Sequence, residues 1–392
     1  MLNEAEEIIA VAKRENNQKR NYLVVNRLQG KYVPVHPKQA LMLFGRLGEL
    51  VKHAYPEERL LVVGFAETAT AIGAALAVKL NTWYVQTTRE QIEGAEYLEF
   101  LEAHSHAPEQ RLVCSGLDTV LPDIDRVIFA EDELTTGNTI INLVRQMKTA
   151  YPGAYRFTAA SLLNGMDTAA LERFIKEDIE PLFLLKINNR HFPEIAEKIT
   201  ANGTFWTAPP SENSSPSISW KQLSGWINAR KCVRAKEYQN ACEHLWQQIQ
   251  ELIREPVRNR DETKARKENS RDSKKSLRRR ILVLGTEEFM YPALYAASRL
   301  EEEAENEVYF HATSRSPILP SCEEGYPLYS RYELVSLYEK TRKTFLYNLD
   351  AYDQVLVITD AQNVCSEGAR TLAGALSSSK NQNIQWIRWC RT

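Results

Sequence analysis

Three adjacent acidic residues followed by a small polar loop form the segment best suited to chemistry. Glu131, Asp132 and Glu133 precede a leucine and then a Thr-Thr-Gly-Asn-Thr loop. The loop consists of Thr135, Thr136, Gly137, Asn138 and Thr139. Hydroxyl groups and free backbone N–H groups at the start of a helix favour a phosphate. Carboxylates would repel that phosphate, so we expect them to face sugar hydroxyls or a metal ion that bridges to the ligand.

The residues on either side of this segment predict how it is positioned. Residues 127–130 are apolar without alternation, which is typical of a strand buried on both faces of a parallel sheet. Residues 140–147 place apolar side chains at helical spacing, so a helix should begin at the loop. Gly137 would let the backbone approach a phosphate closely. The alternative is an ordinary strand, loop and helix in which threonine only caps the helix.

A second loop of small residues follows an earlier strand. Residues 60–64 form an apolar run that ends in glycine, and a helix of small residues comes after the loop. The loop contains Ala66, Glu67, Thr68 and Ala69. Such a loop places backbone amides at the carboxyl end of a sheet, where α/β folds bind ligands. The alternative is that these residues are small because the helix packs tightly on the strand.

A third candidate region follows the strand predicted at residues 82–86. Arg89 begins a polar stretch that continues to about residue 110 and contains His104 and His106. A loop of this length is uncommon unless it is functional or mobile. No third ligand accompanies the two histidines, which argues against a metal site. A loop that contacts a ligand and a solvated histidine pair are the two interpretations left open.

Composition places the chain among globular proteins and leaves its partners open. The 392 residues suggest two or three domains, and 43% hydrophobic with 26% charged residues is usual for such proteins. A net charge of −2 gives no argument for nucleic-acid or membrane binding. The charged N-terminus is not a secretory signal, and no apolar run is long enough to span a bilayer. Six cysteines without Cys-x-x-Cys spacing suggest a reducing cytoplasm.

Composition also divides the rest of the chain. Residues 4–20 are predicted to form a polar helix, and residues 22–35 two strands around a turn. The segment 207–219 is rich in Pro and Ser and is predicted to be a linker, and residues 220–253 have a helical composition. Residues 258–280 carry eleven Lys or Arg against four Asp or Glu. We favour a solvated connector. The alternative is a nucleic-acid tether, but no aromatic residue lies among these charges to stack on bases.

The C-terminal part repeats the plan of the N-terminal part. Residues 281–288 and the helix after them parallel residues 60–78, residues 308–315 parallel residues 83–89, and residues 352–360 parallel residues 124–132. We infer a second, smaller α/β unit that is a degenerate duplicate of the first. It keeps Asp360 but has lost the threonine loop.

The acidic segment and its loop resemble the 5-phosphoribosyl-1-pyrophosphate (PRPP) loop of type I phosphoribosyltransferases. The resemblance implies a parallel sheet with helices on both faces and a hood over its carboxyl end. It implies that Glu131, Asp132 and Glu133 with the loop of residues 135–139 bind PRPP. By the same resemblance, the loop of residues 66–69 with Arg89, His104 and His106 binds the pyrophosphate, and Glu131, Asp132 and Arg89 are the catalytic residues. Mg²⁺, held mainly by PRPP, is the implied cofactor, with metal ligands in the protein unknown. A nitrogenous base or base-like acceptor is the implied partner, and type I relatives commonly form homodimers.

A further resemblance concerns the C-terminal unit. Residues 313–317, Thr-Ser-Arg-Ser-Pro, are similar to the motif that names the TRSP-type C-terminal domain of one phosphoribosyltransferase group. That group occurs in bacterial tellurium-resistance and stress gene clusters, which implies a stress-related pathway for a nucleotide-like metabolite. The alternatives to an enzyme are a PRPP- or nucleotide-binding regulator and a scaffold that acts through its helix and basic connector.

These interpretations divide the chain into five regions. We expect a phosphoribosyltransferase-like domain at 1–206, a linker at 207–219, a helical segment at 220–256, a basic connector at 257–280 and a TRSP-type α/β domain at 281–392.

If the resemblance is right, replacing Asp132 by Asn should reduce activity far more than replacing His191. Asp132 lies in the acidic segment, whereas His191 belongs to no candidate motif. Pyrophosphate release in the presence of mixed bases measures the difference. Equal losses, or none, would count against the assignment.

Overall fold

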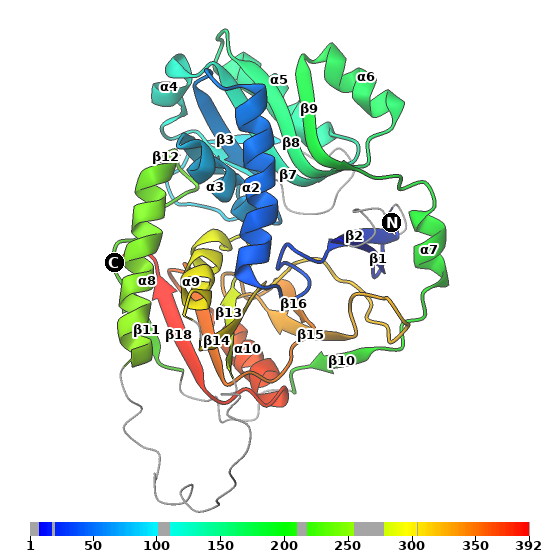
Figure 1. Cartoon of the computed structure of the whole chain (residues 1–392), viewed down its shortest axis with the longest axis vertical. Helices are drawn as coiled ribbons and strands as arrows, with labels where there is room; N and C mark the ends of the chain where they lie inside the picture. The colour runs from blue at the N-terminus through cyan, green and yellow to red at the C-terminus, as the bar shows by residue number, and fades with distance from the viewer. Residues whose placement is uncertain are drawn as a thin grey trace, which may run out of the picture.

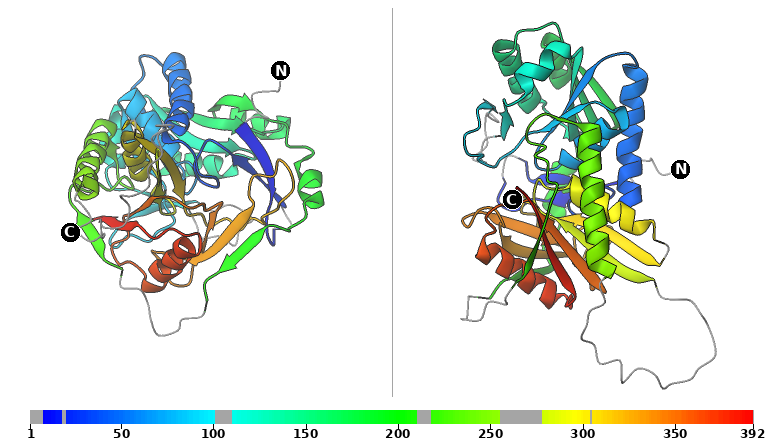
Figure 2. Two further views of the ribbon diagram at one scale, coloured as in Figure 1. Left: turned by 60° about the horizontal axis from the view of Figure 1, so that its bottom comes forward. Right: turned by 90° about the vertical axis from the view of Figure 1, so that its left-hand side faces the viewer.

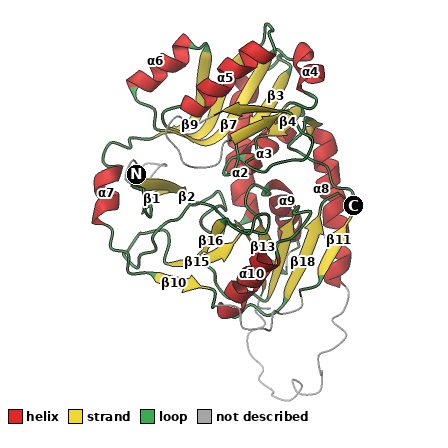
Figure 3. Ribbon diagram, turned by 180° about the vertical axis from the view of Figure 1, so that it is seen from behind, coloured by secondary structure: helices red, strands yellow, loops and turns green. Residues whose placement is uncertain are grey.

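The computed structural model describes residues 8–17, 20–100, 110–209, 218–254, 278–303 and 305–391. Two α/β units lie one above the other along the long axis of the molecule, and a hairpin, β1 and β2, lies beside them (Figure 1). Each unit is built on a mainly parallel sheet with helices packed on it, as Figure 3 shows by secondary structure. This arrangement confirms the predicted α/β class with a second α/β unit.

The N-terminal unit contains a six-stranded sheet in the order β12-β4-β3-β7-β8-β9. All its strands are parallel except β12, which pairs antiparallel with β4. The strands are β3 (Leu60–Gly64), β4 (Trp83–Gln86), β7 (Arg126–Leu134), β8 (Arg156–Asn164), β9 (Ile179–Lys186) and β12 (Val233–Arg234). The helical elements are α2 (Pro37–Ala54), α3 (Thr70–Leu80), α4 (Leu117–Val120), the 3₁₀ turn η1 (Leu121–Asp123), α5 (Asn138–Ala150), α6 (Thr168–Lys176) and α7 (Phe192–Lys198).

The apolar pattern of the sequence accounts for this core. Every residue of β3 is buried, as expected for a strand covered on both faces. Helix α2 buries Leu43, Phe44, Leu47 and Val51, which share one face at a spacing of three to four residues. These side chains anchor α2 and leave its polar face to solvent.

The C-terminal unit contains a five-stranded parallel sheet in the order β11-β18-β17-β13-β14. Its strands are β11 (Trp220–Leu223), β13 (Arg279–Gly285), β14 (Asn306–Ala312), β17 (Gln354–Thr359) and β18 (Ile384–Trp389), and its helices are α8 (Ala235–Arg254), α9 (Tyr291–Glu301) and α10 (Ser366–Ser378).

Three small sheets complete the fold. Strand β1 (Ile9–Lys13) pairs antiparallel with β2 (Tyr22–Asn26), and β5 (Tyr97–Phe100) pairs antiparallel with β6 (Gln110–Val113). Strand β15 (Ser330–Val335) pairs antiparallel with β16 (Lys343–Tyr347) and parallel with β10 (Thr204–Thr207).

The two units share one strand order, which supports the predicted duplication. The N-terminal sheet contains β4-β3-β7-β8 and the C-terminal sheet β14-β13-β17-β18, with each strand in the same place along the chain. A hairpin is inserted at the same point in both, β5-β6 in one and β15-β16 in the other. An isolated β-bridge also corresponds in the two units. Thr88 pairs with Arg111, and Ser314, the equivalent of Thr88, pairs with Phe345. Different strand orders would have contradicted a duplication.

Several local predictions differ from the structure. The predicted polar helix at residues 4–20 is wrong, because residues 9–13 form β1, which pairs with β2. The helix predicted from residue 220 begins at Ala235, because residues 220–223 and 233–234 add β11 and β12 to the edges of the two sheets. Most of the predicted linker and of the basic connector lies outside the described residues.

The units interlock by exchanging short strand segments. Val233 of β12, just before α8, pairs with Tyr84 in the N-terminal sheet. Val35, just before α2, forms the equivalent bridge to Phe310 in the C-terminal sheet. Figure 2 shows the two units stacked end to end, with α8 running along both.

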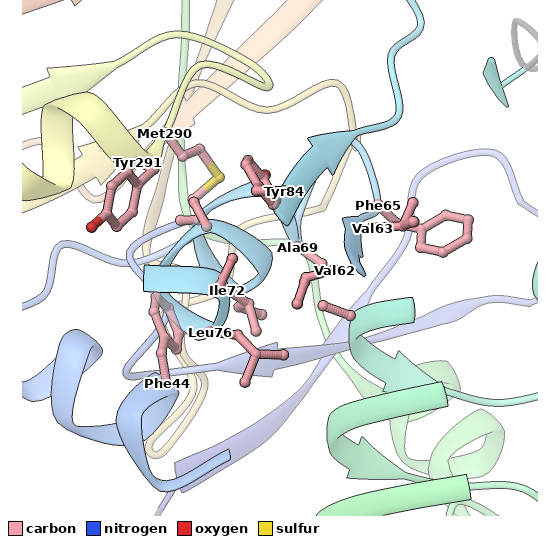
Figure 4. Close-up of a cluster of buried hydrophobic side chains, with 14 of the residues drawn as sticks. Phe44, Val62, Val63, Phe65, Ala69, Ile72, Leu76, Tyr84, Met290 and Tyr291 are labelled. Atoms are coloured by element: carbon pink, nitrogen blue, oxygen red, sulfur yellow. The ribbon is translucent and has the colours of Figure 1, made fainter. Parts of the chain in front are cut away.

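A continuous apolar core crosses the boundary between the units. Helix α3 packs against both α9 and α8, and α2 packs against α9. Figure 4 shows Ile72 of α3 and Tyr84 of β4 beside Met290 and Tyr291 of the C-terminal unit. Among the described helices, none has the length and apolar character needed to cross a membrane.

Buried charges also join the units. The guanidinium of Arg230 lies 2.7 Å from Glu288 Oε1 and 2.5 Å from Asp360 Oδ2. The Arg230 side chain is 9% exposed, and those of Glu288 and Asp360 are 1% and 3% exposed. Removing the cation would leave two buried carboxylates without their partner.

We therefore expect Arg230→Met to lower the free energy of unfolding by about 3–5 kcal/mol, because an uncompensated buried charge costs that much. Arg59→Met is the matched control, since Arg59 pairs with Asp125 at 3.0 Å but is 60% exposed. Its loss should cost only about 0–1 kcal/mol. Guanidinium denaturation measures both, and equal effects would show that the buried pairs contribute no more than a surface pair.

Candidate functional site

The candidate residues lie where β3, β4 and β7 of the N-terminal unit end. Because parallel strands end at one edge of a sheet, the loops after them meet there. Several residues in these loops form hydrogen bonds with the loops that follow β13 and β14 of the C-terminal unit. The candidate residues therefore lie at the boundary between the two units.

Strand β7 continues through the acidic residues instead of ending before them. Glu131 and Glu133 stay in register with Ser161 and Leu163 of β8. Side chains alternate along a strand, so Asp132 points to the face opposite that of its two acidic neighbours. The three carboxylates consequently do not converge on one point, which the sequence pattern did not reveal.

Asp132 connects the two principal loops. The hydroxyl of Thr68 donates a hydrogen bond of 2.9 Å to Asp132 Oδ1. Burial raises the pKa of the Asp132 carboxyl, and the bond from Thr68 offsets that effect only in part. The acidic segment and the loop of residues 66–69 therefore form one site.

Glu133 is held by the N-terminal segment. Its carboxylate lies 2.7 Å and 3.0 Å from Nη2 of Arg20. Burial raises the pKa of Glu133, although the charge of Arg20 opposes this. The Arg20 guanidinium also lies 4.5 Å from the ring centre of Tyr22 in β2. This contact ties the hairpin to the acidic segment.

The threonine loop leads directly into α5. Gly137 occupies the N-cap position with a φ of 69°, in the left-handed region, and gives the helix no side-chain cap. A Cβ at Gly137 would lie 2.1 Å from Phe174 Cε1, so a larger residue would displace the loop. Thr136 and Asn138 are exposed at the first turn of the helix. An exposed, uncapped helix start of this kind suits a phosphate.

The loop of residues 66–69 is held from both sides. The backbone N–H of Ala66 donates to Thr87 Oγ1 at 2.8 Å, and the Ala66–Glu67 peptide bond is cis. Glu67 pairs with the fully buried Lys31 at 2.8 Å and accepts a bond of 3.1 Å from the backbone N–H of Arg315. Burial opposes ionisation of Glu67, but Lys31 and Arg315 together outweigh it and lower its pKa.

The remaining predicted residues differ in where they lie relative to the site. The backbone N–H of Arg89 donates to Glu288 Oε2 at 3.2 Å, which puts Arg89 at the boundary between the units. His104 and His106 lie outside the described residues. His191 is 67% exposed, 3.5 Å from Glu194.

Sequence reasoning missed three residues of the site. Arg20 and Lys31 belong to no motif, so only the folded chain shows that they reach Glu133 and Glu67. Tyr32 is buried, and burial with the nearby charges of Asp132 and Glu67 raises its pKa to about 12, against the effect of the hydrogen bond that its hydroxyl donates to Ser316. The parallel between Arg315 and Arg89 was visible in the sequence, but the contact of Arg315 with Glu67 was not.

The donor atoms suit Mg²⁺ bound mainly by its ligand. Among the described residues, no group of three or more His, Cys, Asp or Glu could hold a metal by itself. Mg²⁺ commonly uses one or two carboxylates together with substrate phosphates and water. Asp132 supplies such a carboxylate beside the threonine loop, and Glu131 supplies a second on the opposite face of β7.

The equivalent position in the C-terminal unit is filled. Asp360, directly after β17, corresponds to Asp132 in β7. Its carboxylate accepts a hydrogen bond of 2.7 Å from the Tyr338 hydroxyl and also pairs with Arg230. Tyr32 precedes the start of α2 by the same number of residues as Arg230 precedes the start of α8. It is therefore the residue of the N-terminal unit that corresponds to Arg230. The candidate ligand site is therefore the one in the N-terminal unit.

Comparisons with known proteins identify both units. A family model described as phosphoribosyl transferase matches residues 8–182. A second model, described as the TRSP domain C-terminal to that transferase, matches residues 253–375. The two matches appear in the order in which the models are described, and they confirm the resemblance of both units.

Several solved structures are similar to part of this chain. Adenine phosphoribosyltransferase from Rhodothermus marinus is 17% identical, covers 47% of this chain and 98% of its own, and has a TM-score of 0.33. The enzyme from Giardia lamblia with 9-deazaadenine is 14% identical with coverages of 47% and 96% and a TM-score of 0.33. The enzyme from Leishmania tarentolae is 14% identical with coverages of 46% and 84% and a TM-score of 0.34. No curated protein matches the chain.

The raised pKa of Asp132 predicts that Asp132→Asn stabilises the fold while it impairs the site. A carboxyl whose pKa is higher in the folded than in the unfolded protein opposes folding when it is ionised. We expect a higher free energy of unfolding for the variant at pH 7, and the difference should shrink as the pH falls through the pKa of the folded state. Guanidinium denaturation over a pH series tests this, and a variant less stable at pH 7 would contradict it.

Proposed function

We propose that this phosphoribosyltransferase, which carries a C-terminal TRSP domain, joins a nitrogenous base or base-like acceptor to PRPP and releases pyrophosphate. One observation carries the proposal. The Thr68 hydroxyl lies 2.9 Å from the Asp132 carboxylate, so the loop after β3 and the acidic end of β7 belong to one site beside the uncapped start of α5. PRPP has three parts that match these three elements: a pyrophosphate, a ribose and a 5′-phosphate.

The threonine loop suits the 5′-phosphate. Residues 135–139 offer hydroxyl groups and the first backbone N–H groups of α5. The positive end of the helix dipole adds to their attraction for an anion. Gly137 allows the close approach, because its φ of 69° is costly for other residues.

Asp132 suits the ribose, and the resemblance assigns Glu131, on the opposite face of β7, to the same sugar. Vicinal hydroxyls donate hydrogen bonds to carboxylates, and those bonds strengthen when the sugar becomes cationic. Phosphoribosyl transfer passes through an oxocarbenium-like centre, so a fixed carboxylate near the ring stabilises the transition state more than the ground state. The catalytic contribution of these residues is charge stabilisation and positioning.

The loop of residues 66–69, with Arg89, suits the leaving pyrophosphate. Because Glu67 is paired with Lys31 and Arg315, the loop offers the backbone N–H groups of Glu67 and Thr68 rather than a free carboxylate. The N–H groups of Ala66 and Ala69 are already bonded within the protein. His104 and His106 stay candidates for the same group. When it is bound, Mg²⁺ neutralises charge on the pyrophosphate oxygens.

The acceptor enters, in this proposal, from the side of the β1-β2 hairpin, which Arg20 ties to the acidic segment. The reaction would take place in the cytoplasm, and all six cysteine thiols are free, as a reducing compartment requires. We place the product in a stress-related pathway of nucleotide-like metabolites, and two subunits could associate, as the resemblance implies. A regulator that binds PRPP without turnover is the alternative, and pyrophosphate release distinguishes the two.

Titration calorimetry of PRPP with Mg²⁺ tests the phosphate site. Thr136→Ile should weaken PRPP binding by about 10-fold to 100-fold, because a hydrogen bond to a charged group has that value. Thr149→Ile is the matched control, since Thr149 is also exposed but lies in the last turn of the same helix. Equal affinities for the wild type and Thr136→Ile would move the phosphate elsewhere, and absence of PRPP binding to the wild type would refute the proposed function.

A further inference from the structure

Arg315 of the C-terminal unit lies against the loop that we assign to pyrophosphate. It follows β14 at the position equivalent to Arg89 after β4. Its backbone N–H donates to Glu67 Oε1 at 3.1 Å, and its Nε lies 3.4 Å from Glu67 Oε2. A residue more than two hundred positions away in the chain therefore contacts the loop through both its backbone and its side chain.

The Arg315 side chain is held in place by further carboxylates. Its Nε lies 2.6 Å from Glu287 Oε2, and its Nη2 lies 2.5 Å from Glu90 Oε1. The side chain is 12% exposed, so these ion pairs are poorly screened by water. Its Nη1 is buried without a hydrogen-bond partner. The guanidinium thus keeps an unused donor in a cluster that borders the loop.

Arg342 belongs to the same cluster but does not contact the loop. Its Nη1 lies 2.6 Å from Glu90 Oε1 and 2.8 Å from Glu287 Oε2. Arg342 thus shares two carboxylates with Arg315, and only Arg315 of the pair also reaches Glu67. This difference separates the effect on the loop from the effect on the cluster.

The position of the Glu67 carboxylate decides whether the loop accepts an anion. A free carboxylate within the loop would repel pyrophosphate, whereas one turned toward Lys31 and Arg315 leaves the backbone N–H groups of Glu67 and Thr68 to meet an anion. Lys31 alone provides one contact, at 2.8 Å. Arg315 adds a backbone bond to Oε1, and its side chain supplies the cation beside Oε2, at 3.4 Å, so the position of the second oxygen depends on the Arg315 side chain.

We propose that Arg315 is a positioning residue of the pyrophosphate subsite, which makes the active site a composite of both units. The inference rests on the proposed function. Arg315 acts through Glu67: it holds the carboxylate away from the ligand and the loop in the form that binds pyrophosphate. The C-terminal unit, whose own equivalent site is filled, serves in this way to complete the site of the N-terminal unit.

The test compares three ligands by calorimetry with the full chain in the presence of Mg²⁺. Inorganic pyrophosphate and PRPP report on the subsite, and ribose 5-phosphate reports on the remainder of the site. Arg315→Gln should weaken pyrophosphate and PRPP binding by about 10-fold to 100-fold, a loss of the size expected when a binding group is displaced. Its affinity for ribose 5-phosphate should not change.

Two further variants keep the proposal falsifiable. Arg342→Gln removes a cation from the same cluster and should leave the affinities for all three ligands as in the wild type. The double variant Glu67→Gln, Arg315→Gln removes the carboxylate that Arg315 controls, so it should regain most of the lost pyrophosphate affinity. Thermal denaturation establishes that each variant is folded, including the double variant, in which the buried Lys31 loses its carboxylate partner. Because the double variant has no carboxylate at position 67, its pyrophosphate affinity tests the proposal even where Arg315→Gln alone does not fold.

The outcomes separate this inference from the proposed function. If the wild type binds PRPP and Arg315→Gln binds it equally well, or loses ribose 5-phosphate to the same extent, the inference is overturned and the proposed function stands. A selective loss that Glu67→Gln does not restore also overturns the positioning role, since Arg315 would then act on the ligand directly. If the wild type binds neither PRPP nor pyrophosphate, both proposals fail.

Discussion

The two units are held in one arrangement by the need to neutralise carboxylates buried between them. Five acidic groups lie at or near this boundary with four cations, and the pairs cross it in both directions. The acids are Glu67, Glu90, Glu287, Glu288 and Asp360, and the cations are Lys31, Arg230, Arg315 and Arg342. A buried charge is tolerated only with its partner in place, so a shift of one unit against the other would cost several ion pairs at once. The apolar contacts of α3 with α8 and α9 add attraction but allow more than one alignment. The ion pairs select the one in which the loops after β3 and β13 face each other.

One sheet plan thus carries two different sites. Asp132 and Asp360 occupy equivalent strands, but Asp132 accepts a bond from Thr68 within its own unit, whereas Asp360 is paired with Arg230 and Tyr338. A guanidinium fixed on the second carboxylate takes the place that a ligand would need. The shared strand order supplies the framework, and the residues at the carboxyl ends of the strands make the two positions differ.

The sequence predicted the parts of the fold that local pattern determines. The apolar residues 127–130 and the helical spacing after residue 138 correctly placed β7 and α5 around the threonine loop. Local pattern failed where distant strands pair: residues 9–13 became β1 through β2, and residues 220–234 became two edge strands rather than a helix. The pairs of Glu67 with Lys31 and of Glu133 with Arg20 could not be predicted either, since nothing in a single sequence indicates which cation meets which carboxylate. The role of the acidic segment was predicted only through a resemblance. The structure was needed to show that β7 continues through this segment, so that the side chains of Asp132 and Glu133 point to opposite faces.

The exchanged strand segments have a consequence for how the protein is made. The N-terminal sheet has its edge strand β12 only when residues 233–234 are available, and the C-terminal sheet uses Val35 from the start of the chain. On the ribosome, the first unit would therefore wait for more than forty residues beyond the end of β9 before its sheet could be completed. The second unit would find its partner segment already present. A chain released before residues 233–234 would expose the free edge of β4, and an unpaired edge strand is prone to pair with other chains.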